Sequence, residues 1–179
     1  KAQTLDEQMR DVLQFLPGVF DQKIRKIVMN KSYRNTMEIA RYAEKLTGVK
    51  DVELLKRHGK EVVEEQYKTE DAVLDEILSK AKLGEDEYET AAIITMTEAE
   101  ASTLYQILKA RGEEVHYIDR NSSVFKKGLT VTTFYLAKGL EFDQVFGVFQ
   151  DAGNPMLNQA KYICATRALH ELYMYQITE

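Results

Sequence analysis

The hydrophobic pattern of the chain alternates between short apolar runs and amphipathic stretches. Short runs rich in β-branched or aromatic residues predict strands over residues 24–29, 91–94, 115–118, 129–134, 145–149 and 172–175. Apolar stripes at helical spacing, bounded by capping residues or glycine, predict helices over residues 6–16, 35–48, 70–82, 97–112 and 157–169. Residues 52–67 are predicted to form a hairpin that turns near His58 and Gly59.

Two of these helices begin with the spacing of a capping box. In this motif a polar side chain caps the helix, and an acidic side chain three residues later returns a hydrogen bond. Asn35 with Glu38 and Thr97 with Glu100 have the required spacing. We therefore expect Asn35 and Thr97 to cap their helices.

The order of the elements predicts the fold class. Buried strands that alternate with helices are typical of an α/β sandwich with a mostly parallel central sheet. In such sheets ligands bind at the carboxyl ends of the strands, so residues that follow strands are the first candidates for a site.

Length and composition fit one globular domain over residues 1–179. No run approaches the roughly 18 apolar residues that a membrane-spanning helix needs, so no membrane partner is expected. The single Cys164 cannot form an intramolecular disulfide and lacks companions for a metal site, which favours a cytoplasmic protein. The chain starts at Lys1, without an initiator Met, and we interpret it as a piece of a longer protein.

The net charge of −5 argues against a nucleic-acid binder, but the charges are unevenly distributed. Residues 22–37 hold five basic and no acidic residues, and residues 120–140 hold four basic and no acidic residues. These windows are either ordinary solvated surface or the borders of one anion-binding cleft.

Three sequence runs follow or adjoin predicted strands: 30–36 (NKSYRNT), 132–142 (TTFYLAKGLEF) and 162–172 (YICATRALHEL). The first contains Arg34 and the third contains Arg167. An arginine guanidinium holds phosphate bidentately and keeps its charge, and phosphoryl transfer relies mainly on positioning and positive charge. A lone arginine of this kind is more often a surface ion pair.

In order and spacing, these runs resemble motifs IV, V and VI of the UvrD/Rep-type superfamily 1 DNA helicases. The likeness extends over residues 1–179. The sequences LAKGLEFD and ATRALHELYMY are most similar to those of the HelD branch, whose members associate with bacterial RNA polymerase. It implies a second RecA-like motor domain: a three-layer sandwich that works beside a first RecA-like domain of the same parent chain.

The resemblance also implies roles for individual residues. Arg34 and Arg167 would contact the γ-phosphate of ATP as catalytic arginine fingers. Tyr33 would stack near the adenine, while Gly139 and Glu141 would lie near the nucleotide sugar.

A second group would contact DNA, either a single strand or a duplex: Thr133, Tyr135 and Lys138. Tyr135 stands where UvrD and Rep usually have a histidine, so a histidine-specific DNA contact does not carry over.

The phosphate-binding half of an ATP site is missing from the sequence. It contains neither a GxxxxGK[ST] loop nor an Asp-Glu pair after an apolar strand that would hold Mg²⁺. ATP and Mg²⁺ would be cofactors of the full-length parent, and we expect the isolated chain not to hydrolyse ATP.

Three functions stay open at this point. The parent is an ATP-dependent DNA helicase or translocase, an RNA polymerase-binding remodeling or recycling factor of the HelD type, or an interaction module without an ATPase role. Retention of both arginines argues against the third.

Overall fold

The computed structural model describes residues 31–32, 34–48, 53–54, 56–84, 87–122 and 126–178. The predicted helix over residues 6–16 and the predicted strand over residues 24–29 lie outside these ranges. A two-residue strand, β1 (Lys31–Ser32), pairs in parallel with β2 (Glu53–Leu54).

A six-stranded sheet forms the centre of the fold. Its order is β3-β8-β7-β4-β6-β5, and every pairing in it is parallel. The strands are β3 (Val63–Tyr67), β4 (Thr90–Thr95), β5 (Val115–Tyr117), β6 (Gly128–Thr133), β7 (Phe142–Phe149) and β8 (Ala168–Ile177). This confirms the predicted α/β class.

The strand β4 lies inside the sheet between β7 and β6. All six of its residues are buried, as expected for a parallel strand that is covered on both faces. Ile93 pairs with Val131 of β6 and with Phe146 of β7. The continuous apolar run that predicted this strand therefore reflects its central position.

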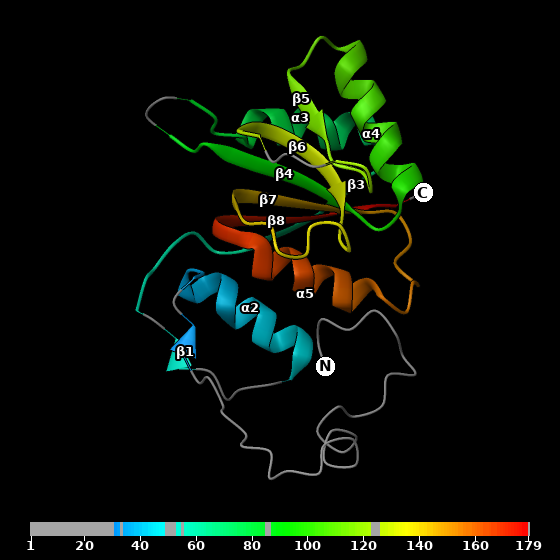
Figure 1. Ribbon diagram of the computed structural model, residues 1–179. Coiled ribbons are helices and arrows are strands. Elements are labelled where there is room, and N and C mark those ends of the chain that lie inside the picture. Colours follow the sequence, from blue (N-terminus) through cyan, green and yellow to red (C-terminus); the bar gives the residue numbers. More distant parts are fainter. Residues whose placement is uncertain are drawn as a thin grey trace, which may run out of the picture.

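Helices cover both faces of the sheet (Figure 1). On one face lie α2 (Met37–Thr47) and α5 (Leu157–Arg167), and on the other lie α3 (Glu70–Lys80) and α4 (Glu98–Ala110). Each face has its own apolar core, represented by Ile163 and Leu172 on the first and by Leu104 and Val131 on the second. The arrangement is the expected RecA-like three-layer sandwich.

The predicted cap at Thr97 is confirmed. Its hydroxyl accepts a hydrogen bond from the backbone N of Glu100 (3.2 Å), and its own N donates to Oε2 of Glu100 (2.8 Å). The helix α2 ends as predicted at Gly48, whose φ of 68° is the left-handed conformation that glycine adopts without strain.

The predicted cap at Asn35 is wrong. The cap of α2 is Thr36, whose hydroxyl accepts from the backbone N of Ile39. The Asn35 amide donates instead to the carbonyl oxygens of Ala165 (2.9 Å) and Ala168 (2.6 Å). A long-range contact has displaced the local one that the spacing suggested.

The predicted hairpin over residues 52–67 is also wrong. Its two described strands pair in parallel with different partners, β2 with β1 and β3 with β8. None of the described helices is long and apolar enough to cross a membrane.

Candidate functional site

Arg34, Glu141 and Arg167 gather at the amino end of the two neighbouring strands β7 and β8. Glu141 directly precedes β7, and Arg167 is the last residue of α5, directly before β8. Phe142 and Ala168 are register partners, so the residues before them are brought side by side. Arg34 joins this pair through an ion pair of its Nε with Oε1 of Glu141 (2.8 Å).

This placement corrects the expectation from the sequence. We expected ligand-binding residues after strands, at the carboxyl edge of the sheet, and predicted that α5 would continue to residue 169. The helix ends at Arg167, and the chain passes straight into β8 at Ala168. As a result, both arginines lie at the amino edge.

Arg167 is the most unusual side chain at this edge, because it is a buried cation. Only 6% of the residue is exposed. Its Nη1 donates to the carbonyl oxygen of Leu140 (3.0 Å) and its Nη2 to the hydroxyl of Thr166 (3.4 Å). Its Nε is buried without a hydrogen-bond partner, and within the described ranges no carboxylate lies at ion-pair distance from this guanidinium.

The electrostatic surroundings of Arg167 favour an incoming anion. Burial and then the neighbouring Arg34 lower the pKa of Arg167, while Glu141 acts in the opposite direction. A buried charge is costly unless it is paired and hydrogen-bonded. An anion that bound here would supply the missing partner for Nε and the missing countercharge.

Arg34 and Glu141 are open to solvent, with 48% and 41% of their side chains exposed. An exposed ion pair of this kind contributes only about 0–1 kcal/mol, so a ligand can separate it at little cost. Arg34 is thus an accessible cation beside the buried cation Arg167.

Gly139 shapes the segment that supplies Leu140 and Glu141. Its φ is +88°, a conformation that side chains other than glycine rarely adopt, while the space around its α-carbon is open. The glycine is therefore required by the backbone turn and not by a close contact. The turn places the Leu140 carbonyl where it accepts from Arg167.

Two of the predicted DNA-contacting residues, Thr133 and Tyr135, lie at the opposite, carboxyl end of the sheet. Thr133 is the last residue of β6 and is buried, and its hydroxyl has no hydrogen-bond partner. Tyr135 donates from its hydroxyl to Oε1 of Glu98 (2.8 Å), which also accepts from Nε of Arg120 (2.8 Å). The structure therefore does not bring Thr133 and Tyr135 together with the arginines.

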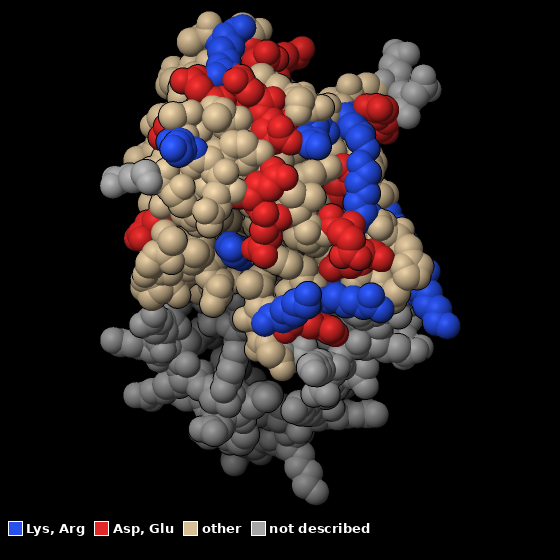
Figure 2. Space-filling model, turned by 180° about the vertical axis from the view of Figure 1, so that it is seen from behind, with Lys and Arg blue, Asp and Glu red and all other residues tan. Residues whose placement is uncertain are grey.

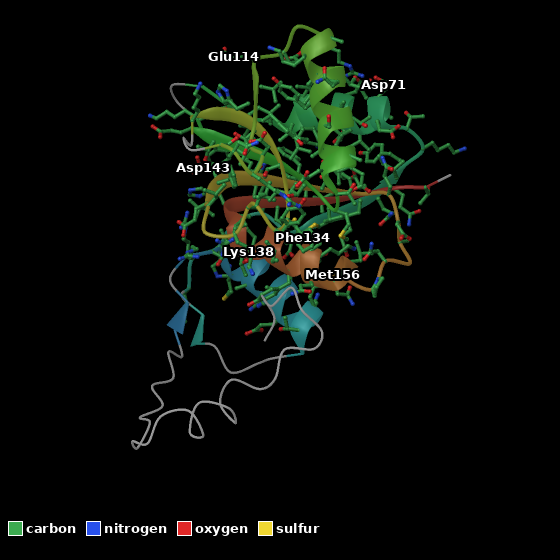
Figure 3. All side chains as sticks on the ribbon, turned by 45° about the vertical axis from the view of Figure 1, so that its right-hand side comes forward. Asp71, Glu114, Phe134, Lys138, Asp143 and Met156 are labelled. Carbon is green, nitrogen blue, oxygen red and sulfur yellow. The ribbon has the colours of Figure 1, made fainter. Side chains whose placement is uncertain are left out.

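Lys138 lies on the connection between the two ends. From the carboxyl end of β6 the chain runs over the face that carries α2 and α5, where Phe134 and Ala137 enter the core. Figure 3 shows Lys138 on the side of this segment nearer to Asp143, at the start of β7. The remaining predicted residue, Tyr33, lies outside the described residues.

The second basic window does not line a single cleft. Arg120 pairs with Glu98 after β5, and Lys127 pairs with Glu89 before β6, so they lie toward opposite ends of the sheet. On the face seen in Figure 2, Lys and Arg side chains are interspersed with Asp and Glu. Arg120 and Lys127 thus lie on solvated surface in exposed ion pairs, while most of the first basic window lies outside the described residues.

Sequence reasoning missed two residues beside the arginines, Arg57 and His170. Nη1 of Arg57 donates to the carbonyl oxygen of Arg34 (3.4 Å), and its Nη2 lies 2.6 Å from Nδ1 of His170. Arg57 falls within the segment that was expected to be a hairpin, and it has no local signal of its own. Only the fold brings it to the site.

A buried carboxylate, Glu171, stabilises the same edge of the sheet. Only 2% of it is exposed. Burial by itself would raise its pKa, but hydrogen bonds outweigh burial and lower the pKa to about 2. The donors that lower it are Lys82, Tyr173, Lys60 and Gln144, and the Tyr88 hydroxyl also donates to Oε1 (3.3 Å).

Neither a metal cluster nor a reactive thiol emerges from the part of the chain that the structure describes. It contains no group of three or more His, Cys, Asp and Glu side chains that could hold a metal ion. Cys164 is fully buried, and burial raises the pKa of its thiol, which favours the unreactive protonated form.

Comparison with solved structures shows a similar domain. The chain is 28% identical to the C-terminal domain of a possible DNA helicase from Lactobacillus plantarum WCFS1, with a TM-score of 0.59, over 82% of this chain and 88% of that one. No protein-family model matches the sequence, and no curated protein matches it.

Two further similar structures are the arterivirus helicase nonstructural protein 10, alone and in complex with DNA. They are 14% and 13% identical, with TM-scores of 0.43 and 0.44. The chain covers 65% and 66% of its own length in these matches but only 27% and 28% of theirs.

Proposed function

We propose that this chain is the second motor domain of an ATP-dependent DNA helicase or translocase and supplies Arg34 and Arg167 to an ATP site between two domains. The observation that carries the proposal is the buried guanidinium of Arg167, which has an unpartnered Nε and lies beside the accessible Arg34. The likeness to the helicase domain from Lactobacillus plantarum supports the same assignment.

The two arginines would act on the γ-phosphate of ATP bound by the first RecA-like domain. That domain would contribute the phosphate loop, the Mg²⁺ ligands and the group that orients the attacking water. Phosphoryl transfer spreads negative charge over the equatorial oxygens, and arginine side chains offset it. Only 6% of Arg167 is exposed, so closure of the domains would have to open a path from the phosphate to its guanidinium.

Other residues of the site would bind the rest of the nucleotide. Glu141 and Gly139 would approach the sugar, and Tyr33 would stack near the adenine. Closure of the cleft between the domains would present Arg34 and Arg167 to the phosphate, and hydrolysis would reopen it.

The opposite edge of the sheet would face DNA. Tyr135 offers a half-buried ring just after the carboxyl end of β6, where Thr133 itself is buried, and the exposed Lys138 follows on the connection toward β7. This segment runs on to Glu141 and thereby connects the proposed DNA track to the proposed ATP site. A shift in one site would therefore be transmitted to the other along residues 133–141.

A second candidate function is the motor of a HelD-like factor that displaces RNA polymerase. The sequence LAKGLEFD favours this function, and so does Tyr135, which stands where UvrD and Rep usually have histidine. Both functions use the same arginine half-site and differ in the partner on which the motor acts.

Substitution of the arginines in the full parent protein tests the proposal. Arg34→Ala and Arg167→Ala should each lower ATP turnover by about 10³-fold or more, the scale of an arginine finger, with a smaller loss of nucleotide affinity. Lys109→Ala, which removes a cation from the exposed side of α4, serves as the control for charge. Turnover at the wild-type rate in both arginine variants would refute the assignment.

A further inference from the structure

We propose that Arg57 is a positioning residue that ties the segment carrying Arg34 to the segment carrying Arg167. The inference rests on the proposed function and adds a residue to the same site. Arg57 lies 23 positions from Arg34 and 113 from His170 in the sequence, yet its guanidinium touches both.

Arg57 holds the Arg34 segment through its side chain and its backbone. Its Nη1 donates to the Arg34 carbonyl, and its own carbonyl accepts from the backbone N of Met37 (2.8 Å) at the start of α2. Gly59 lies so close that an added Cβ would meet Cγ2 of Thr36 at 2.5 Å. Residues 57–59 therefore buttress the turn between Arg34 and α2.

On its other side Arg57 is anchored to His170 at the start of β8. Nη2 of Arg57 lies 2.6 Å from Nδ1 and 3.3 Å from Nε2 of His170, so it contacts both nitrogens of the imidazole ring. A guanidinium only donates hydrogen bonds, so the nitrogen that accepts from it carries no proton. Nε2 also faces Oδ1 of Asp143 at 3.5 Å.

His170 and Asp143 have further contacts of their own. The His170 ring stacks on Tyr88 at a centroid distance of 5.1 Å and an interplanar angle of 19°. Oδ2 of Asp143 accepts from the backbone N of Glu89 and from both the backbone N and the hydroxyl of Thr90. The contacts thus run from the Arg34 carbonyl through Arg57, His170 and Asp143 to the start of β4.

The geometry matters because two arginines must meet one phosphate together. Asn35 already links the Arg34 segment to the end of α5 by hydrogen bonds to the carbonyls of Ala165 and Ala168. Arg57 supplies a second contact, which links the Arg34 segment to β8 through His170. Displacement of a catalytic group by about 1 Å can lower the rate about 100-fold. Loss of the Arg57 contacts should therefore slow turnover.

The test measures steady-state ATP turnover of the full parent protein. Arg57→Ala should lower kcat about 10- to 100-fold and change KM for ATP less than about threefold. His170→Phe keeps a ring on Tyr88 but removes the acceptor, and it should show a similar loss. His170→Gln restores an acceptor and should recover most of the activity, whereas a purely structural role predicts no such recovery.

A double variant separates this inference from the proposed function. Because Arg57 acts through Arg34, Arg34→Ala with Arg57→Ala should be no slower than Arg34→Ala alone. Multiplication of the two losses would overturn the inference, and so would kcat within twofold of wild type in both Arg57→Ala and His170→Phe. Wild-type turnover in both Arg34→Ala and Arg167→Ala would instead overturn the proposed function, and this inference with it.

Discussion

The Nε of Arg34 lies 2.8 Å from Oε1 of Glu141. Both groups are exposed. While the Nε of Arg34 is paired with Glu141, the guanidinium cannot direct all of its N–H groups at a phosphate. The pair therefore competes with the ligand for Arg34. Its strength, about 0–1 kcal/mol for an exposed pair, sets the size of that competition.

Neutralisation of Glu141 should release Arg34 for the nucleotide. In the full parent, Glu141→Gln keeps the size and polarity of the side chain and should lower KM for ATP about two- to fivefold, the change that corresponds to the free energy of the pair. Steady-state kinetics at low ionic strength give the clearest measurement, because salt screens exposed pairs.

Glu114→Gln is the matched control, since it removes the same charge from an exposed position beside β5 (Figure 3). In the sheet, β7, β4 and β6 separate β5 from β8. An equal KM in the two variants would show that Glu141 does not restrain Arg34. A higher KM in Glu141→Gln alone would instead favour a direct contact of its charge with the nucleotide.

Elements with strong local signals were predicted well from the sequence. The strand β4 is a continuous apolar run, and α4 has a capping box at Thr97 and a glycine, Gly112, just past its end. These features act within a few residues, so the pattern alone locates them. The apolar run also fits the burial of β4 on both faces of the sheet, although its central place was not predicted.

Features that depend on long-range pairing were not predictable in the same way. The strand β3 is an edge strand with an exposed centre, and its partner β8 is about 110 positions away. Its charged sequence was therefore taken for one arm of a hairpin. Asn35 has the spacing of a helix cap, but the partners that it uses are 130 and 133 positions distant.

The candidate site was also predictable only in part: its residues carry local motifs, but their surroundings depend on long-range pairing. The motifs identified Arg34, Glu141 and Arg167, which the fold brings together, but they did not show that Arg167 is buried and incompletely hydrogen-bonded. That property depends on the register of β7 with β8, in which Phe142 faces Ala168. Arg57 carried no motif, and only its contacts reveal it.

The stability of the chain in acid should depend on Glu171. Its folded pKa of about 2 lies below its usual value of 4.5. The ionised form therefore stabilises the fold fully above pH 4.5, and this contribution is lost as the pH falls toward 2. Between pH 6 and pH 3 the loss amounts to about 2 kcal/mol in the free energy of unfolding.

Urea unfolding of wild type and Glu171→Gln at pH 6 and pH 3 measures this contribution. The variant should be less stable at pH 6, because Lys60 and Lys82 lose their shared countercharge. Its stability should then fall less between the two pH values, by about 2 kcal/mol. Glu114→Gln controls for the change in net charge, and an unchanged acid dependence in Glu171→Gln would contradict the assignment.

Tyr135 should contribute to DNA binding through its ring and not through its hydroxyl. The ring contacts Phe134 edge-on at 5.5 Å, while the hydroxyl is already engaged by Glu98. Stacking of a base on an aromatic side chain contributes about 1–3 kcal/mol. In the full parent, Tyr135→Ala should therefore weaken binding of a labelled single-stranded oligonucleotide about 5- to 100-fold in fluorescence anisotropy, and Tyr135→Phe should remain close to wild type. If Tyr135→Phe weakens binding as much as Tyr135→Ala, the hydroxyl and its contact with Glu98 are what matter, and the stacking role is wrong.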